Sequence, residues 1–340
     1  MNEINTWLVG GGLAVGAMFA MVLHRFRFCL VAGVSNFMLI RDSRQILAFA
    51  SAWLVAIAGT QLLEITGIVA VADSAYRDPT MDWLGASIGG FVFGLGAALA
   101  GGCAARTLVR AMEGSAHSLI ALISFALVSA VTQFGFLEPF RVKLTQETSI
   151  ALLADAGIAS LLSLPSWLVL GLVVTGLLFF IYKIGDGRPD KPLLIAGGIV
   201  GGLVVFSWYI TGVLAQDELM VERPSAMTLS GPLARFGYML ISGQLPALSF
   251  TTSFVIGTAV VSLLLALVTR QFRITAPAKG MAKMALLGGA LMGFGAITAY
   301  GCNIGQGLSG ISTLSLESLI AVVSMIAGIC VVTRLMEKYA

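Results

Sequence analysis

The four cysteines of this 340-residue chain are the side chains best suited to soft, sulfur-directed chemistry. Cys29, Cys103, Cys302 and Cys330 each stand in a separate apolar segment. No two of them form a C-x-x-C pair, and no pair of histidines stands near them. We therefore expect neither a metal site nor a dithiol redox motif, and no cofactor.

Two of these cysteines close copies of one sequence. Residues 89–103, GGFVFGLGAALAGGC, align without gaps to residues 288–302, GGALMGFGAITAYGC, and eight of the fifteen positions are identical. In each copy the cysteine follows a glycine, Gly102 or Gly301, and precedes a short apolar stretch. If that stretch is a half-helix, its cysteine lies at the N-terminal end. Unpaired backbone amides there carry a partial positive charge that attracts an anion.

A thiol at such a position suits the passage of a sulfur-bearing anion. The S–H group is a weak donor on a polarizable side chain, so it binds the anion and still lets it leave. A thiolate would repel an anion, and we expect the thiols to be neutral during passage. A helix N-terminus favours the thiolate and burial favours the thiol, and the sequence leaves that balance open.

Polar residues near the breaks are candidate partners for the anion. Arg106, three residues after Cys103, either holds an anion or anchors its segment at the membrane surface. Asn303 and Gln306 belong to a segment without charge and are candidate neutral ligands. Cys330 lies in the uniformly apolar run MIAGICVV, so we expect it to be structural.

The composition places these segments in a membrane. Apolar residues make up 58% of the chain and charged residues 11%, against about 25% charged in a soluble domain. A soluble fold could not bury so much apolar surface, so membrane lipid is the expected surroundings. The net charge of +3 is small and dispersed, which argues against a nucleic-acid partner.

Nine apolar runs approach the roughly 20 residues that cross a bilayer. They are Trp7–Leu23, Ile46–Ala70, Leu84–Ala100, Ser118–Leu137, Trp167–Tyr182, Leu193–Leu214, Phe250–Val268, Gly280–Ala299 and Leu316–Leu335. Four shorter apolar stretches are predicted to be re-entrant or half-helices that line a cavity. These are Leu30–Ile40, Ala104–Met112, Leu229–Ile241 and Asn303–Ser312.

The lysines and arginines predict the orientation. With nine spans, fifteen of them fall on one side of the membrane and five on the other. The positive-inside rule then places the N-terminus in the periplasm and the C-terminus in the cytoplasm. Because the two repeated spans run in opposite directions, the repeat has inverted topology.

The predicted architecture is therefore an all-α integral membrane protein. It has nine transmembrane helices, four short re-entrant or half-helices and an inverted internal repeat, in one domain covering residues 1–340. The first half is residues 1–140, a connector is residues 141–190, and the second half is residues 191–340. The segment RPSAMTLSGP, from Arg223 to Pro232, either shapes a vestibule or connects two spans.

The motifs together resemble the YeeE/YedE family of sulfur transporters. The resemblance rests on HRFRFCL around Cys29, GLGAALAGGCAARTLVR around Cys103, GFGAITAYGCNIGQGLSG around Cys302, and RPSAMTLSGP. The best-understood members take up thiosulfate through nine spanning and four short helices. The resemblance implies that Cys29, Cys103 and Cys302 pass the ion along by S–H contacts. It also implies a separate cytoplasmic sulfur-carrier protein of the TusA type as a possible partner.

The expected function is uptake of thiosulfate across the inner membrane, feeding sulfur assimilation. The alternative within transport is another soft sulfur or selenium species. A membrane thiol–disulfide enzyme is a further alternative, but it would need two neighbouring thiols, whereas each segment holds one cysteine. We therefore expect a protein that is not an enzyme. The source of energy stays open between proton symport and downhill flow.

Overall fold

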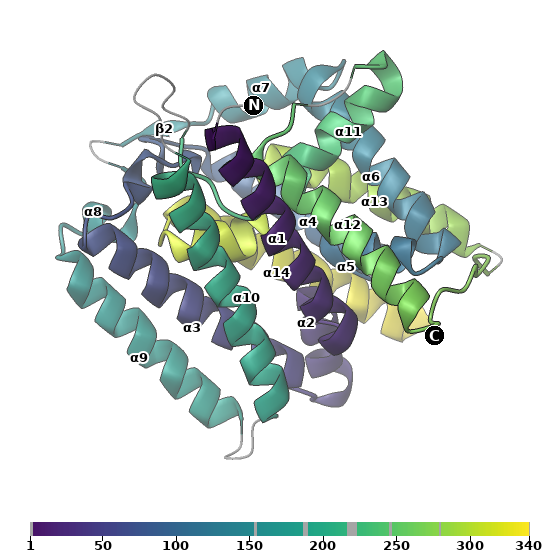
Figure 1. Ribbon diagram of the computed structural model, residues 1–340, viewed down its shortest axis with the longest axis horizontal. Coiled ribbons are helices and arrows are strands. Elements are labelled where there is room, and N and C mark those ends of the chain that lie inside the picture. The colour runs from purple at the N-terminus through teal and green to yellow at the C-terminus, as the bar shows by residue number, and fades with distance from the viewer. Residues whose placement is uncertain are drawn as a thin grey trace.

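The secondary structure of the described residues is almost all helix. The computed structural model describes residues 3–152, 155–185, 190–215, 223–244, 247–278 and 280–339 (Figure 1). Arg188 and Lys279, two of the basic residues counted above, lie outside these ranges. The only strands among the described residues, β1 and β2, have two residues each and pair antiparallel. The prediction of an all-α membrane protein is confirmed.

The elements follow one another along the chain with short connections. They are α1 (Glu3–Phe26), α2 (Leu30–Ile40), α3 (Arg44–Ile65), the turns η1 (Val71–Asp73) and η2 (Ala75–Arg77), β1 (Thr80–Met81), α4 (Trp83–Leu99), α5 (Ala104–Met112), α6 (Ala116–Phe134), α7 (Glu138–Gln146), β2 (Ile150–Ala151), α8 (Ile158–Leu161), α9 (Ser166–Ile184), α10 (Lys191–Tyr209), η3 (Ile210–Leu214), α11 (Ser230–Ser242), α12 (Phe250–Val268), α13 (Met281–Thr298), η4 (Gly305–Gly310) and α14 (Leu316–Tyr339).

Nine helical segments of the described residues are long and apolar enough to cross a membrane, as predicted. The first and last spans extend beyond their predicted ends, to Phe26 and Tyr339, and two others stop short of theirs. The second span ends at Ile65 instead of Ala70, because Gly67 adopts a φ of 71° and turns the chain back. The fourth ends at Phe134 instead of Leu137, where Gly135 takes an extended conformation.

The four short apolar stretches each contain a helix. Two of them, α2 and α5, have the predicted bounds, and α11 is displaced by one residue. The fourth starts later than predicted: its helical residues run from Gly305 to Ser312, and those from Gly305 to Gly310 form the element η4. Its backbone hydrogen bonds join residues five apart: the Gly307 amide donates to the Cys302 carbonyl, and the Ser309 amide donates to the Ile304 carbonyl. These five-residue steps make η4 a π-helical turn, a form often found at functional sites.

Glycines let the two repeated spans, α4 and α13, approach closely. A methyl group at Gly89 would come within 2.8 Å of the Gly295 carbonyl oxygen, and one at Gly288 within 2.8 Å of the Gly96 carbonyl oxygen. Only glycine tolerates backbones this close. Since the start of each helix meets the end of the other, α4 and α13 run antiparallel.

The main packing contacts between helices each have a counterpart in which the equivalent helices of the other half make the same contact. Helix α4 packs on α14 as α13 packs on α6, and α1 packs on α12 as α10 packs on α3. The glycines agree: Gly90 meets the backbone of Ala321 in α14, and Gly289 meets that of Ala121 in α6. These contacts match α1–α6 with α10–α14. They support the inverted repeat, which stays a prediction.

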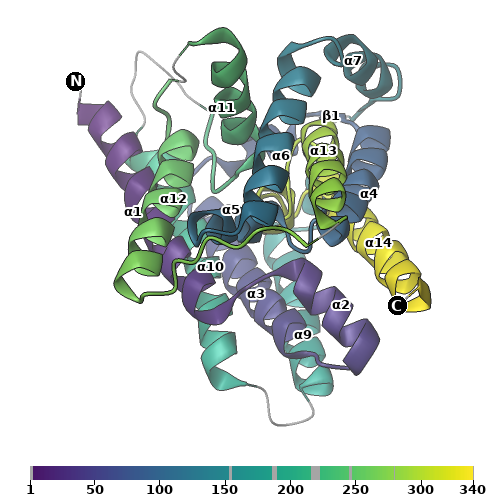
Figure 2. The ribbon, with the colours of Figure 1, turned by 90° about the vertical axis from the view of Figure 1, so that its right-hand side faces the viewer.

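The loops form two separate groups, as nine alternating spans require. On the predicted outer side β1 pairs with β2, and Gly157 bridges to Ser315. On the predicted inner side Ser115 bridges to Thr275. The two chain ends lie at different ends of the molecule in Figure 2.

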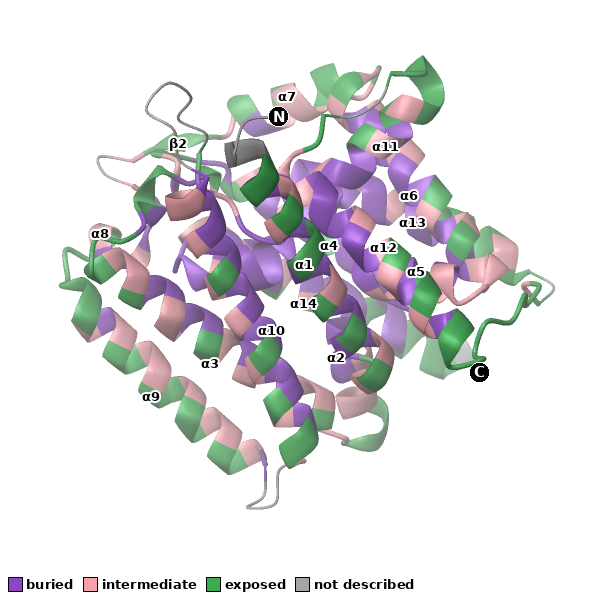
Figure 3. Cartoon of the chain, viewed as in Figure 1, coloured by how far each residue is buried: buried purple, intermediate pink, exposed green. Residues whose placement is uncertain are grey.

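Burial is greatest at the centre of the bundle (Figure 3). Helix α9 lies at the edge, packed mainly on α3, and Val169 is its buried residue. The short helices α2 and α5 and the turn η4 carry much of the buried core, which includes Cys29, Cys103 and Cys302.

Candidate functional site

The first of the three breaks lies between α1 and α2. Arg27 adopts a φ of 53°, and Cys29 then takes an extended conformation as the N-cap residue of α2. The Cys29 carbonyl oxygen accepts the amide of Gly33 at 3.0 Å. The Phe28 ring stacks on Phe49 with centroids 4.4 Å apart. This packing fixes the break and holds the Cys29 side chain in the core.

The other two breaks share one backbone form. Gly102 donates to the Ala97 carbonyl at 2.9 Å, and Gly301 donates to the Ala296 carbonyl at 2.8 Å. The residue before each glycine is left-handed, with φ of 72° at Gly101 and 54° at the aligned tyrosine. A six-to-one bond across a left-handed residue is the Schellman end of a helix. The repeated Gly-Cys sequence therefore marks the end of one helix and the start of the next.

A cysteine precedes each of the two short helical segments that follow these breaks. Cys103 is the N-cap residue of α5, and its carbonyl oxygen accepts the amide of Thr107 at 2.8 Å. The Cys302 carbonyl oxygen accepts the amide of Gln306 at 2.8 Å, at the entry to η4. Unpaired amides of the first turn lie beside these cysteines, and the partial positive charge of the helix end falls there.

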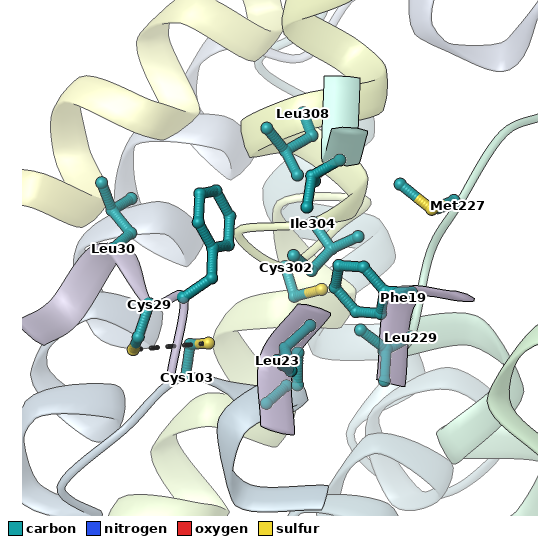
Figure 4. Close-up of a cluster of buried hydrophobic side chains, with 14 of the residues drawn as sticks. Phe19, Leu23, Cys29, Leu30, Cys103, Met227, Leu229, Cys302, Ile304 and Leu308 are labelled. Carbon is teal, nitrogen blue, oxygen red and sulfur yellow. Dashed lines mark hydrogen bonds between the residues drawn. The ribbon is translucent and has the colours of Figure 1, made fainter. Parts of the chain in front are cut away.

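The fold brings two of the thiols into contact. The sulfurs of Cys29 and Cys103 are 3.7 Å apart, and the two residues are 2% and 1% exposed (Figure 4). Cys302, at 0% exposure, belongs to the same buried cluster, with Phe19 and Leu23. The sequence suggested one isolated thiol per segment, whereas the structure forms a thiol pair with a third thiol nearby. Cys330, on α14, is half-buried and packs against the outside of this cluster.

Asn303 and Gln306 have opposite hydrogen-bonding states. Gln306 is fully used: its amide nitrogen donates to the Ala299 carbonyl at 2.7 Å, and its amide oxygen accepts the Ser318 hydroxyl at 2.5 Å. Asn303 is 2% exposed, and neither its amide nitrogen nor its amide oxygen has a partner among the described residues. A buried amide without partners is costly, so Asn303 is the residue of this pair that is free to bind a polar ion.

Arg106 lies beside the thiol pair, one turn into α5. It is half-buried and forms no ion pair with the described residues. A methyl group at Gly102 would come within 3.2 Å of Arg106 Cγ, and one at Gly301 within 2.8 Å of Gln306 Cγ. Each glycine thus leaves room for the side chain that follows its cysteine by one turn.

A cavity of about 490 Å³ opens on the predicted outer side. Most of the segment Arg223–Pro232 that could shape a vestibule lines it, from Pro224 to Gly231, along with Tyr76, Gln133, Arg141 and Tyr300. Of the two roles open to that segment, lining a vestibule agrees with its position. Desolvation of its hydroxyl raises the pKa of Tyr76, so the phenol remains a neutral donor.

The sequence analysis missed Arg141 and Tyr76. Neither lies in a repeated motif: Arg141 is on α7 and Tyr76 is in the turn η2. An arginine on the side with few basic residues was the available signal for Arg141.

Comparison with known proteins gives consistent matches over nearly the whole chain. The family model described as "Sulphur transport" matches residues 25–331. The Thiosulfate transporter TsuA of Escherichia coli (strain K12) is 30% identical over 339 residues, covering 95% of this chain and 93% of that protein. The Thiosulfate transporter TsuA of Spirochaeta thermophila (strain ATCC 700085 / DSM 6578 / Z-1203) is 28% identical over 340 residues, covering 94% and 97%.

Proposed function

Because this chain belongs to the sulphur transport family, as its sequence motifs predicted, we propose that it carries thiosulfate into the cell. The two relatives above are named thiosulfate transporters, and membership of this family supports a transporter and not an enzyme. The observation that carries the proposal is the buried group of three thiols from three different breaks.

The proposed pathway runs from Cys302 to the contacting thiols of Cys103 and Cys29. Its surroundings are apolar, so neutral S–H donors and helix N-termini would stabilise the anion without a full cation in the core. Weak, repeated contacts would allow the ion to move from one thiol to the next. Asn303, with two unpartnered amide atoms, would supply additional neutral contacts near Cys302.

The inverted repeat gives this pathway its two-sided form. We infer that the two halves are related by a pseudo-two-fold axis in the membrane plane, from the antiparallel contact of α4 with α13 and the exchanged packing partners. The segments α5 and η4 would then enter as half-helices from opposite faces. From the excess of basic residues on one side we propose that the N-terminus faces the periplasm and the C-terminus the cytoplasm. We propose the inner membrane as the location.

Imported thiosulfate would feed sulfur assimilation. A separate cytoplasmic sulfur carrier of the TusA type is the partner we propose for this step. Growth of a host that lacks other sulfur uptake, supplied with thiosulfate alone, tests the function. We expect the gene to restore growth and uptake of labelled thiosulfate; normal membrane expression without uptake would overturn the assignment.

A further inference from the structure

The outer cavity extends to the loop that carries Cys302. Its lining includes Ala296, Ile297 and Tyr300, the residues that lead into that loop. Its hydroxyl groups also reach the loop: a methyl group at Gly305 would come within 2.8 Å of Thr228 Oγ1 and 3.5 Å of the Tyr76 hydroxyl oxygen. An ion in this cavity is therefore adjacent to the first proposed thiol of the pathway.

Arg141 is the cation of this lining, and it is not neutralised by an ion pair. Its Nε donates to the Thr132 carbonyl oxygen at 3.3 Å, and the rest of its guanidinium makes no hydrogen bond or ion pair to the described residues. Two other outer arginines are paired: Arg77 binds Glu64 and Asp155, and Arg223 binds Asp78. Arg235 donates to the Ser249 hydroxyl and does not line the cavity. The guanidinium of Arg141 thus has donors left for a ligand.

Asp82 is the carboxyl group that interacts electrostatically with Arg141. Its Oδ1 accepts the amide of Gly85 at 2.9 Å, which caps α4. Burial raises the pKa of Asp82, while the Gly85 amide and Arg141 oppose this shift. The Asp82 carboxyl group caps α4 and forms no salt bridge with Arg141, so the Arg141 guanidinium stays available to a ligand.

The two halves of the chain differ in which element supplies an arginine to the side of the membrane that their repeated cysteine faces. In the first half Arg106 follows Cys103 by three residues on the same short helix. The aligned position after Cys302 is Gly305, and η4 carries no charged residue. Helix α7, which lies between the two halves, supplies Arg141 to that side. The connector therefore restores a charge that the second copy of the motif lacks.

We propose that Arg141 is a specificity-determining residue that captures the substrate dianion in the outer cavity before it reaches Cys302. This inference rests on the proposed function. The guanidinium attracts a doubly charged anion about twice as strongly as a singly charged one, and the cavity hydroxyls complete its shell as neutral donors. Capture outside the thiol pathway sets the affinity for the ion, and the thiols then carry it.

The first test is Arg141→Gln in the full chain, purified and reconstituted in proteoliposomes with labelled thiosulfate. We expect KM to rise about fivefold to tenfold with the maximal rate retained, and the dependence of uptake on ionic strength to weaken. Arg141→Lys should recover most of the affinity. Lys143→Gln removes the same charge from an exposed position on the same helix and should leave KM unchanged.

A second variant adds an opposing charge without disturbing Arg141. Gly231 lines the cavity, has open space around its Cα and stands in the first turn of α11, where an acid is tolerated. Gly231→Asp should raise KM well above that of Gly231→Asn, which has the same shape and no charge. This pair stays informative even if Arg141→Gln fails to fold.

The outcomes separate this inference from the proposed function. Absence of thiosulfate uptake by the unaltered protein removes the proposed function. Normal uptake with an unchanged KM in both Arg141→Gln and Gly231→Asp overturns the capture role. An equal rise in KM for Lys143→Gln also overturns it, since it would show a diffuse surface effect.

Discussion

Substitution of Asn303 and of Gln306 by leucine should change the stability of the protein in opposite directions, although the two side-chain amides are only three residues apart. Both residues are 2% exposed, but the Gln306 side chain makes two hydrogen bonds and the Asn303 side chain makes none with the described residues. We predict that Asn303→Leu, which keeps the branching of the side chain at Cγ, stabilises the protein and stops transport. We predict that Gln306→Leu destabilises it.

The magnitudes follow from the partners. An unsatisfied buried polar group costs about 1–3 kcal/mol, so its removal in Asn303→Leu should return an amount of that order. Gln306→Leu leaves the Ala299 carbonyl and the Ser318 hydroxyl without their partner and should cost about 2–4 kcal/mol. Thermal unfolding of the purified variants in one detergent gives both signs, and proteoliposome uptake gives the function. If Asn303→Leu lowers stability as much as Gln306→Leu, Asn303 is structural and its proposed contact with the ion is wrong.

Three further predictions concern the ion network, the topology and the close helix contacts. Arg77→Met leaves Glu64 and Asp155 without their cation and should lower the free energy of unfolding by about 3–5 kcal/mol, whereas Arg223→Gln, from an exposed pair, should cost less than about 1 kcal/mol; equal effects would refute the burial argument. With the native thiols replaced, a cysteine at Phe136, 82% exposed, should react with an impermeant maleimide in intact spheroplasts, and one at Ile274, 83% exposed, only after permeabilisation; labelling from the same side would contradict the inverted repeat. Gly90→Ala and Gly289→Ala should each weaken thermal stability, while Gly10→Ala, at an open position, should not; a stable Gly90 variant would show that α4 and α14 need not touch there.

The spans and breaks could be predicted because they depend on local physics. Apolar length defines a membrane helix, and the starts of α2 and α5 follow from the breaks that precede them. Gly67 shows the limit of this reading: the residues after it are apolar, and only its left-handed backbone ends α3 before them.

The site was harder to predict, because its important features depend on tertiary contacts. The 3.7 Å approach of Cys29 to Cys103 joins residues from two helix breaks that are far apart in the chain. Asn303 and Gln306 look alike in sequence, and only the positions of Ala299 and Ser318 decide which of them is bonded. Arg141 carries no motif, and its position in the outer cavity depends on how α7 packs.

The central claim is that three buried thiols carry the anion, and alanine substitution of each cysteine tests it most directly. Uptake of labelled thiosulfate is measured in proteoliposomes at matched amounts of folded protein. We expect Cys103→Ala and Cys302→Ala to abolish uptake and Cys29→Ala to reduce it strongly. Cys330→Ala should leave uptake close to normal, because loss of one half-buried sulfur costs only on the order of 1 kcal/mol. Full uptake by Cys103→Ala or Cys302→Ala, or an equal loss at all four positions, would contradict the thiol pathway.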